Sequence, residues 1–485
     1  MLYKSGLVKV AGSTDRMISN VSFDSRQVEK DSLFVAIKGI KTDGHLFIQK
    51  AEENGAACIV CQDFPENQKE NITYVQVEDS SLALSFIAAN FYDKPSEKIK
   101  LIGVTGTNGK TTVASLLHET FISLGHKSGL ISTVSYKINK TESPSAYTTP
   151  DAIAINELLS KMIDEGCEYC FMEVSSHAVV QNRTTALHFA GGIFTNLSQD
   201  HLDYHKDFKQ YLLAKKAFFD MLPAEAFALT NVDDKNGWVM LQNTKAKKYS
   251  YSILTMADYR AKIIDNTASG LVIDFMGVET YCKLVGSFNA YNLLAILSAA
   301  CLLGEDRQNV LTVLSGLDSV EGRFHHIVSP ANVNAIVDYA HTPDALENVL
   351  KTIKDIIKGK KSKVITVFGC GGNRDESKRP IMGAIAAKYS DKVIVTTDNP
   401  RYENHEKITE DIIAGIDPKS KNKTIIIPGR KEAIKTACSI AGENDIILVA
   451  GKGHEKYQEI NGIKHHFDDV EIVMECFEIN NHNTN

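Results

Sequence analysis

Residues 98–112 carry side chains whose types and spacing suit the binding of a polyphosphate. Gly106 and Gly109 allow backbone N–H groups to approach phosphate oxygens without an intervening side chain. Lys110 supplies a positive charge for the outer phosphates, and the Thr111 hydroxyl is a ligand that suits Mg²⁺. This stretch therefore predicts a loop that binds a nucleoside triphosphate.

The elements around this loop are predicted by their apolar pattern. Leu101, Ile102 and Val104 indicate a buried strand before the turn, and residues 113–124 indicate a helix after it. The positive end of a helix dipole would then favour the bound anion. Val104 stands where the general phosphate-loop pattern has a glycine, so the form is the narrower Gly-Thr-Asn-Gly-Lys-Thr. The alternative is an ordinary strand, turn and helix with glycines placed by chance.

A carboxylate ends a second apolar stretch, at residues 170–177, Cys-Phe-Met-Glu-Val-Ser-Ser-His. In a parallel sheet, ligands gather at the carboxyl ends of the strands. Glu173 could therefore bind Mg²⁺ beside the phosphate loop. A strand end capped by hydroxyl groups, without chemistry, is the alternative.

Further polar positions follow along the central part of the chain. Residues 193–205 form a strand that runs into a turn rich in Asp and His, including Asp200 and His201, which is either a metal or phosphate site or a hydrogen-bonded turn. The helix at 211–219 contains adjacent lysines, to which physical reasoning alone assigns no role. Asn289 and Asn292 lie three residues apart and can project from one helix face.

The order of apolar and polar segments predicts three α/β domains, at residues 1–96, 97–327 and 328–485. Alternating strands and helices in the central part predict a mostly parallel sheet with helices on both faces. The third part has the same alternation and is predicted to be Rossmann-like. Four of its strand ends are polar, which indicates a polar cleft; they are residues 338–344, 369–375, 398–401 and 451–455.

Composition narrows the class of protein. The chain has 485 residues, of which 43% are hydrophobic and 23% charged, as in soluble globular proteins. A net charge of −7 argues against nucleic-acid binding through bulk charge. Neither a signal peptide nor a transmembrane segment is expected, so we expect a cytoplasmic protein without a membrane partner. Nine cysteines predict reduced thiols. Two Cys-x-x-Cys pairs, at 58–61 and 167–170, are either buried small side chains or a zinc site.

Taken together, the motifs identify a resemblance to the Mur ligases of peptidoglycan synthesis that covers nearly the whole chain. The resemblance is carried, in order, by FDSR, DGH, GTNGKTT, TTP, EVSSH, DHLDYH, GSFNAYN, EGRF, DYAHTPD, GCGGNRD, DNPR and GKGHE. It implies an ATP-dependent ligase that phosphorylates a carboxylate and lets an amine attack the acyl phosphate. Phosphoryl transfer needs positioning and charge neutralisation more than covalent help from the protein.

The resemblance also implies metal ligands and a modified lysine. One Mg²⁺ would be held by Thr111 and Glu173, and a second by His201 and a carbamylated Lys215. Lys110, Glu173, His201 and Lys215 would be the catalytic residues. Carbamylation turns an amine into an anionic oxygen ligand and needs a neutral lysine, which burial favours. Lys216 is the rival, but it lies about 100° away around a helix, so only one of the two can face the site.

The substrates implied by the resemblance are ATP, UDP-MurNAc-L-Ala-D-Glu and meso-diaminopimelate, with Mg²⁺ as cofactor. The implied ATP-binding residues are Gly106, Thr107, Asn108, Gly109, Lys110, Thr111, Thr112, Asn289, Asn292, Arg323, Asp338 and His341. The N-terminal domain would bind the uridine diphosphate, and the nucleotide-peptide set is Ser25, Asp43, Gly44, His45, Thr148, Thr149, Ser175, Gln181 and Arg183. The implied diaminopimelate set is Arg374, Asp398, Asn399, Pro400, Arg401, Gly451 and Glu455.

Arg401 carries the predicted choice of amino acid. Meso-diaminopimelate has a second carboxylate that lysine lacks, and a guanidinium binds a carboxylate through two parallel hydrogen bonds. The alternatives are the same ligase with L-lysine, or another ligase of the superfamily, such as the D-alanyl-D-alanine-adding Mur ligase or folylpolyglutamate synthase. A nucleotide-gated binding protein is the alternative that is not an enzyme. The chain is expected to be a monomer that serves cell-wall growth, cell shape and division.

Overall fold

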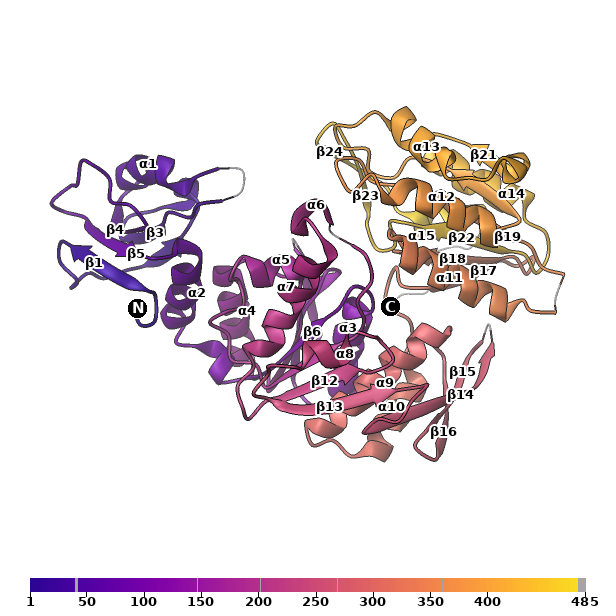
Figure 1. The fold of residues 1–485 in the computed structure, drawn as a ribbon, viewed down its shortest axis with the longest axis horizontal. Coiled ribbons are helices and arrows are strands. Elements are labelled where there is room, and N and C mark those ends of the chain that lie inside the picture. Colours follow the sequence, from indigo (N-terminus) through magenta and orange to yellow (C-terminus); the bar gives the residue numbers. More distant parts are fainter. Residues whose placement is uncertain (40–41, 146, 201, 268, 360, 479–485) are drawn as a thin grey trace.

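The computed structural model describes residues 1–39, 42–145, 147–200, 202–267, 269–359 and 361–478, with the backbone alone at 202 and 203. Within these residues, three separate large sheets follow one another along the chain, together with one two-stranded sheet. Figure 1 shows the N-terminal part at one end, the central part in the middle and the third part beside it. The predicted three-part α/β fold is confirmed.

The N-terminal sheet has the order β1-β5-β4-β3-β2, and only the β1–β5 pair is antiparallel. Apolar side chains fill both faces, under α1 on one side and α2 on the other. Its elements are β1 (Leu7–Ala11), β2 (Asn20–Ser22), β3 (Ser32–Val35), β4 (Ala56–Cys61), β5 (Thr73–Val77), α1 (Ile48–Glu53), α2 (Ser80–Phe91) and the 3₁₀ turns η1 (Ser25–Gln27), η2 (Gly44–Phe47) and η3 (Pro95–Glu97).

The central sheet has eleven strands in the order β16-β15-β14-β13-β12-β11-β6-β10-β7-β8-β9, parallel from β14 through β7 and antiparallel at both ends. Its strands are β6 (Lys100–Thr105), β7 (Ser128–Ile131), β8 (Ser135–Ile138), β9 (Thr141–Pro144), β10 (Tyr169–Glu173), β11 (Gly191–Phe194), β12 (Phe227–Asn231), β13 (Lys247–Ser252), β14 (Tyr259–Thr267), β15 (Gly270–Phe275) and β16 (Val278–Cys282).

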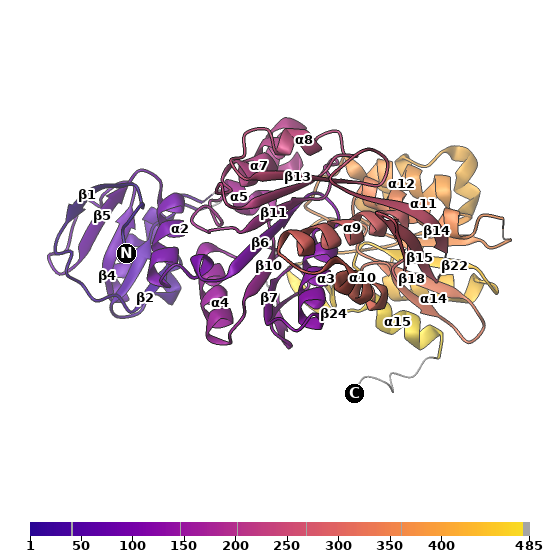
Figure 2. The ribbon, with the colours of Figure 1, turned by 90° about the horizontal axis from the view of Figure 1, so that it is seen from below.

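Helices cover the central sheet on two faces, as the alternating pattern predicts. One apolar core lies under α3, α9 and α10, and another lies under α4 and α7. Figure 2 shows α9 and α10 beside the strands β14 and β15. The helices are α3 (Lys110–Ser123), α4 (Ala152–Asp164), α5 (Ser176–Val180), α6 (Leu202–His205), α7 (Phe208–Asp220), α8 (Gly237–Met240), α9 (Ser287–Leu302) and α10 (Arg307–Gly316).

The third sheet has the order β17-β18-β22-β19-β20-β21, with only β17 antiparallel. The domain boundary predicted at 327/328 falls inside β17, which pairs with β18. The elements are β17 (His325–Val328), β18 (Asn334–Asp338), β19 (Val364–Phe368), β20 (Lys392–Val395), β21 (Thr424–Ile426), β22 (Ile446–Ala450), the hairpin β23 (Tyr457–Ile460) and β24 (Ile463–His466), α11 (Pro343–Ile356), α12 (Lys378–Tyr389), α13 (His405–Ala414), η4 (Pro418–Lys423), α14 (Arg430–Ile440) and α15 (Asp469–Cys476).

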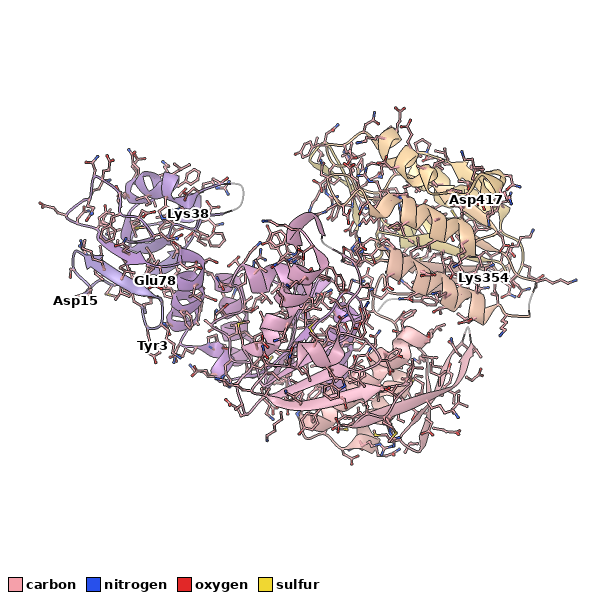
Figure 3. The ribbon with its side chains drawn as sticks, in the orientation of Figure 1. Tyr3, Asp15, Lys38, Glu78, Lys354 and Asp417 are labelled. Carbon is pink, nitrogen blue, oxygen red and sulfur yellow. The ribbon has the colours of Figure 1, made fainter. Side chains whose placement is uncertain are left out.

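Figure 3 shows the separation of the outer domains through labelled side chains: Lys38 and Glu78 lie on the N-terminal domain, and Lys354 and Asp417 lie on the third domain. None of the described helices is long and apolar enough to cross a membrane. The nine cysteines are free thiols, and those of both Cys-x-x-Cys pairs are buried. This burial favours their interpretation as small apolar side chains over a zinc site.

Candidate active site between the central and third domains

The phosphate-binding loop connects β6 to α3 at the carboxyl edge of the central sheet. Gly109 has a φ of +86°, and a Cβ there would lie 2.7 Å from Asn292 Oδ1. A Cβ at Gly106 would collide with the Thr195 hydroxyl. Both positions therefore require glycine. The helix begins at Lys110, three residues earlier than expected from the apolar pattern, because Gly109 turns the chain directly into it.

Lys110 folds back over this loop. Its Nζ donates to the carbonyl oxygens of Gly106 at 3.0 Å and Thr107 at 2.8 Å. Burial lowers the pKa of Lys110, while the carboxylates of Glu173 and Asp200 act in the opposite direction. An ammonium in this position, surrounded by loop backbone, is suited to phosphate oxygens.

Glu173 ends β10, the strand next to β6, and its side chain is fully buried. Glu173 Oε1 accepts a hydrogen bond from Thr133 N at 2.7 Å. Its other oxygen, Oε2, is buried and has no hydrogen-bond partner among the described residues. A buried carboxylate oxygen without a donor is the kind of ligand that Mg²⁺ uses, so Glu173 fits the predicted role.

The rest of the predicted metal set is only partly described. The described residues contain no cluster of three or more His, Cys, Asp or Glu side chains that could hold a metal ion. The predicted set is of a different kind, because it includes the Thr111 hydroxyl and a modified lysine. His201, its fourth member, lies outside the described residues.

The two adjacent lysines of α7 face different surroundings. Lys215 is 1% exposed, and its Nζ donates to Gly106 O at 2.7 Å. Burial lowers the pKa of Lys215 well below its usual range, and the nearby charge of Lys110 lowers it further. Lys216 instead pairs with Asp220 at 2.7 Å, one turn along the helix. Only Lys215 therefore reaches the phosphate loop, and it does so as a readily deprotonated amine.

The phosphate loop, Glu173 and Lys215 line one cavity. Five residues of the predicted nucleotide-peptide set line it too: Thr148, Thr149, Ser175, Gln181 and Arg183. Arg183 Nη1 donates to Thr149 O at 2.7 Å, and Nη2 donates to Gln181 Oε1 at 2.6 Å. Thr149 in turn donates to the Glu173 carbonyl oxygen at 2.7 Å. These hydrogen bonds connect the nucleotide-peptide residues of the cavity wall to β10, the strand that ends in Glu173.

The N-terminal members of that set lie elsewhere. Ser25, Gly44 and His45 belong to the 3₁₀ turns of the first domain, Asp43 caps η2, and none of the four lines the cavity. His45 Nδ1 lies 2.7 Å from Asp43 Oδ1, and His45 Nε2 accepts from Gln62 N at 3.0 Å. These bonds fix the orientation of the imidazole on the first domain.

Third-domain residues form the opposite wall of the cavity. The predicted amino-acid residues that line it are Arg374, Asp398, Asn399, Arg401, Gly451 and Glu455; Pro400 does not. Arg401 has a φ of +53°, and its Nη1 donates to Gly372 O at 2.9 Å. Its Nε lies 3.4 Å from Glu459 Oε2 in β23. The β23–β24 hairpin therefore helps to fix the position of the Arg401 guanidinium at the cavity wall.

The predicted ATP-binding residues outside the loop are gathered where the two domains meet. Asn289, Asn292, Arg323, Asp338 and His341 all line the cavity, whereas Gly106 does not. Burial lowers the pKa of His341 to about 4, so this imidazole is neutral near pH 7. The cavity has a volume of about 1040 Å³.

Several residues of this region were missed by the sequence reasoning. Asp344 Oδ2 accepts from Asn108 Nδ2 at 2.8 Å and so joins the phosphate loop to α11. Lys378 Nζ donates to the His341 carbonyl oxygen at 2.9 Å. Lys452 lies fully buried behind the amino-acid wall. Asp344 and Lys452 belong to motifs quoted above, but nothing in their spacing indicates which partners they meet.

Comparison with known proteins agrees with this geometry. Family models match residues 17–92 (Mur ligase family, catalytic domain), 104–300 (Mur ligase middle domain) and 322–453 (Mur ligase, glutamate ligase domain). The UDP-N-acetylmuramoyl-L-alanyl-D-glutamate--2,6-diaminopimelate ligase of Phocaeicola vulgatus is 54% identical over 97% of both chains, and that of Clostridioides difficile is 41% identical over 97% of both.

Solved structures resemble the chain along nearly its whole length. A structure of a ligase with the same name has 32% identity and a TM-score of 0.68, covering 97% of this chain and 98% of its own. The MurF ligase of Thermotoga maritima in complex with ADP has 19% identity and a TM-score of 0.63, covering 96% and 98%. The latter likeness supports the fold alone.

Proposed function

The chain belongs to the Mur ligase family, and from this premise we propose that it joins meso-diaminopimelate to UDP-MurNAc-L-Ala-D-Glu at the expense of ATP. One observation carries the proposal: a single cavity has the phosphate loop, Glu173 and Lys215 on one side and Arg401 with Glu455 on the other. The names of the relatives at 41–54% identity support the same reaction. The product would serve peptidoglycan synthesis, and through it cell shape and division.

The central wall would carry out phosphoryl transfer. Lys110 and the N-terminus of α3 would hold the phosphates of ATP, and Asn289, Asn292 and His341 would hold the rest of the nucleotide. Thr111 and Glu173 would hold one Mg²⁺, and His201 with Lys215 a second, which neutralises phosphate charge when bound. The γ-phosphoryl group would pass to the D-glutamate carboxylate held near Arg183, so that an acyl phosphate forms and ADP is released.

Lys215 would act as a carbamate. Its neutral amine attacks CO₂, a nitrogen–carbon bond forms, and one proton leaves to solvent. The result is an anionic oxygen ligand in place of an amine, which Mg²⁺ prefers. The buried position of Lys215 and its depressed pKa support this modification.

The third-domain wall would present the amine. Asp398 and Glu455 suit the ammonium at one end of meso-diaminopimelate, and Arg374 and Arg401 suit its carboxylates. The reacting ammonium loses a proton to solvent, and its nitrogen attacks the acyl-phosphate carbon. The amide C–N bond forms, the C–O bond to the phosphoryl group breaks, and phosphate leaves. Closure of the domains around this step would keep water away from the acyl phosphate.

The choice of diaminopimelate over L-lysine rests on Arg401. With lysine bound, the N–H groups of this guanidinium that do not contact Glu459 or Gly372 would face no second carboxylate, and the lost hydrogen bonds weaken binding of the wrong substrate. We further propose that the protein is a cytoplasmic monomer. L-lysine addition, another amine acceptor and nucleotide binding without catalysis are retained as outcomes of the test.

The test is ADP release by the purified protein with Mg-ATP and UDP-MurNAc-L-Ala-D-Glu. Parallel reactions contain meso-diaminopimelate, L-lysine, D-alanyl-D-alanine or no amine. Release with diaminopimelate alone is the expected result. Release with lysine would leave the ligase reaction standing and refute the specificity. Saturable ATP binding without release under any condition would refute the enzymatic proposal.

A further inference from the structure

A buried lysine lies behind the amino-acid wall of the cavity. Lys452 is 0% exposed and does not itself line the cavity. Its Nζ lies 3.0 Å from Asn399 Oδ1, 3.4 Å from Glu455 Oε2 and 3.5 Å from Asp398 Oδ1. All three partners line the cavity. The lysine therefore contacts the groups proposed to receive the substrate amine, without contacting the substrate.

These contacts fix the orientation of Asn399. Its Oδ1 receives hydrogen bonds from Lys452 Nζ and from Glu459 N at 2.9 Å. Both partners can only donate, so the carbonyl end of the amide must face them. The amide nitrogen then points the other way and donates to Glu455 Oε2 at 2.8 Å. Without the Lys452 ammonium, Asn399 Oδ1 would lose one of the two hydrogen-bond donors that fix its orientation.

Lys452 also balances charge at this wall. Burial and the neighbouring Asp398 carboxylate raise the pKa of Glu455, and the Lys452 ammonium opposes that rise. With Asp398 and Glu455 ionised and Lys452 protonated, the cluster carries one net negative charge. A cluster of this charge is complementary to one incoming ammonium group.

Other groups also face Glu455. The phenol groups of Tyr339 and Tyr457 lie near it, and the buried Arg430 guanidinium contributes a more distant positive charge. Arg430 is already paired with Asp469 at 2.7 Å. Lys452 is therefore the cation that contacts both Asp398 and Glu455 among the described residues.

We propose that Lys452 is a positioning residue of the amino-acid site: it aligns Asp398, Asn399 and Glu455 and keeps both carboxylates ionised to receive the substrate amine. This inference rests on the proposed function and deepens it. It assigns a role to a side chain that never touches the substrate.

The experiment replaces Lys452 with methionine, which has a similar length and no charge. We expect the KM for meso-diaminopimelate to rise by about tenfold or more and the KM for ATP to stay within about twofold. The acid limb of the kcat/KM profile for diaminopimelate should move up by about one pH unit, because the carboxylates lose their counter-charge. Lys216→Met is the matched control, since Lys216 is also a buried lysine paired with a carboxylate.

A second variant separates charge from packing. Lys452→Met/Asp398→Asn removes one positive and one negative charge, so its acid limb should return toward that of the wild type while KM stays high. A parallel loss of activity for all substrates, with no shift of the acid limb, would overturn the inference. Unchanged diaminopimelate kinetics in Lys452→Met would also overturn it.

Folding is checked by thermal melting and by ADP binding to the central domain. If Lys452→Met does not fold, Lys452→Arg takes its place, because it keeps the charge and changes its position. A raised KM for diaminopimelate with an unshifted acid limb then supports the inference, and an unchanged KM refutes it. Wild-type protein that releases no ADP with diaminopimelate would instead refute the proposed function, so the two failures are distinguishable.

Discussion

Arg323 Nη2 donates a hydrogen bond to Thr111 Oγ1 at 3.0 Å, although the two residues are 212 positions apart in the sequence. Arg323 lies between the last helix of the central domain and the first strand of the third sheet. Its guanidinium also stacks over the ring of Tyr339 at 4.4 Å. One arginine therefore contacts the phosphate loop and the third domain together.

This geometry predicts a nucleotide-binding defect in Arg323→Ala. The KM for ATP should rise by about tenfold or more, because a charged hydrogen-bond donor beside the phosphate site is lost. Arg323→Lys should recover only part of the ATP affinity. An ammonium is not planar, so it cannot stack on an aromatic ring or form two parallel hydrogen bonds as a guanidinium does. Steady-state ADP release at varied ATP measures both effects. Exposed Arg260→Ala is the control, and an ATP KM equal to wild type in Arg323→Ala would contradict the prediction.

Replacing Lys215 with alanine should reduce ADP release to background, because the proposed carbamate ligand disappears. High bicarbonate should partly restore activity, because the bicarbonate anion can enter the vacated space and supply an anionic oxygen ligand. Lys216→Ala should retain activity within about threefold, since its ammonium pairs with Asp220 one turn along the helix and does not reach the phosphate loop. Both variants are assayed with and without bicarbonate. Full activity of Lys215→Ala would remove the carbamate from the mechanism.

Replacing Arg401 with alanine should impair use of diaminopimelate without affecting the nucleotide. The kcat/KM for diaminopimelate should fall by about a hundredfold, because the proposed fork to the distal carboxylate is lost. Binding of ATP should survive, since Arg401 belongs to the third-domain wall. Competition between diaminopimelate and L-lysine measures the change in preference. If diaminopimelate kinetics match those of the wild type, Arg401 does not belong to the amino-acid pocket.

The buried His118 predicts a loss of stability in mild acid. Burial lowers its pKa to about 4, with the nearby Lys137 charge adding to the effect. An unfolded histidine titrates near 6.5, so between these values the unfolded chain binds a proton that the native state excludes. The free energy of unfolding therefore falls as pH falls through this window, by about 2 kcal/mol at pH 5.

Urea unfolding of wild type and His118→Gln at pH 7 and pH 5 tests this effect. The variant should show a shallower dependence on pH, even if its stability at pH 7 is lower. His465→Gln is the control, because that side chain is exposed. An equal pH dependence in wild type and His118→Gln would show that His118 does not carry the effect.

Local pattern was sufficient for the layered fold and for the phosphate loop. Apolar runs such as Leu101, Ile102 and Val104 form buried strands, and the helices between them cover both faces of the sheets. A loop with glycine, lysine and threonine in fixed order depends on backbone conformations that neighbouring residues impose. Such features are encoded within a few residues, which is why they can be read directly.

Other features depend on residues that are distant in the sequence. The packing of α7 against the phosphate loop decided that Lys215, and not Lys216, reaches this loop. The contacts around Lys452 required the ends of two strands of one sheet, β20 and β22, to meet at the same edge. The Arg323–Thr111 and Asn108–Asp344 hydrogen bonds required two domains to face one another.

By itself, the sequence determined the classes of chemistry present and the order of the elements that carry them. The tertiary structure decided which side chains share one cavity, which are buried, and which charge faces which. The physical reason is that hydrogen bonds and charge interactions act over a few ångströms in space, whereas motifs record only separation along the chain.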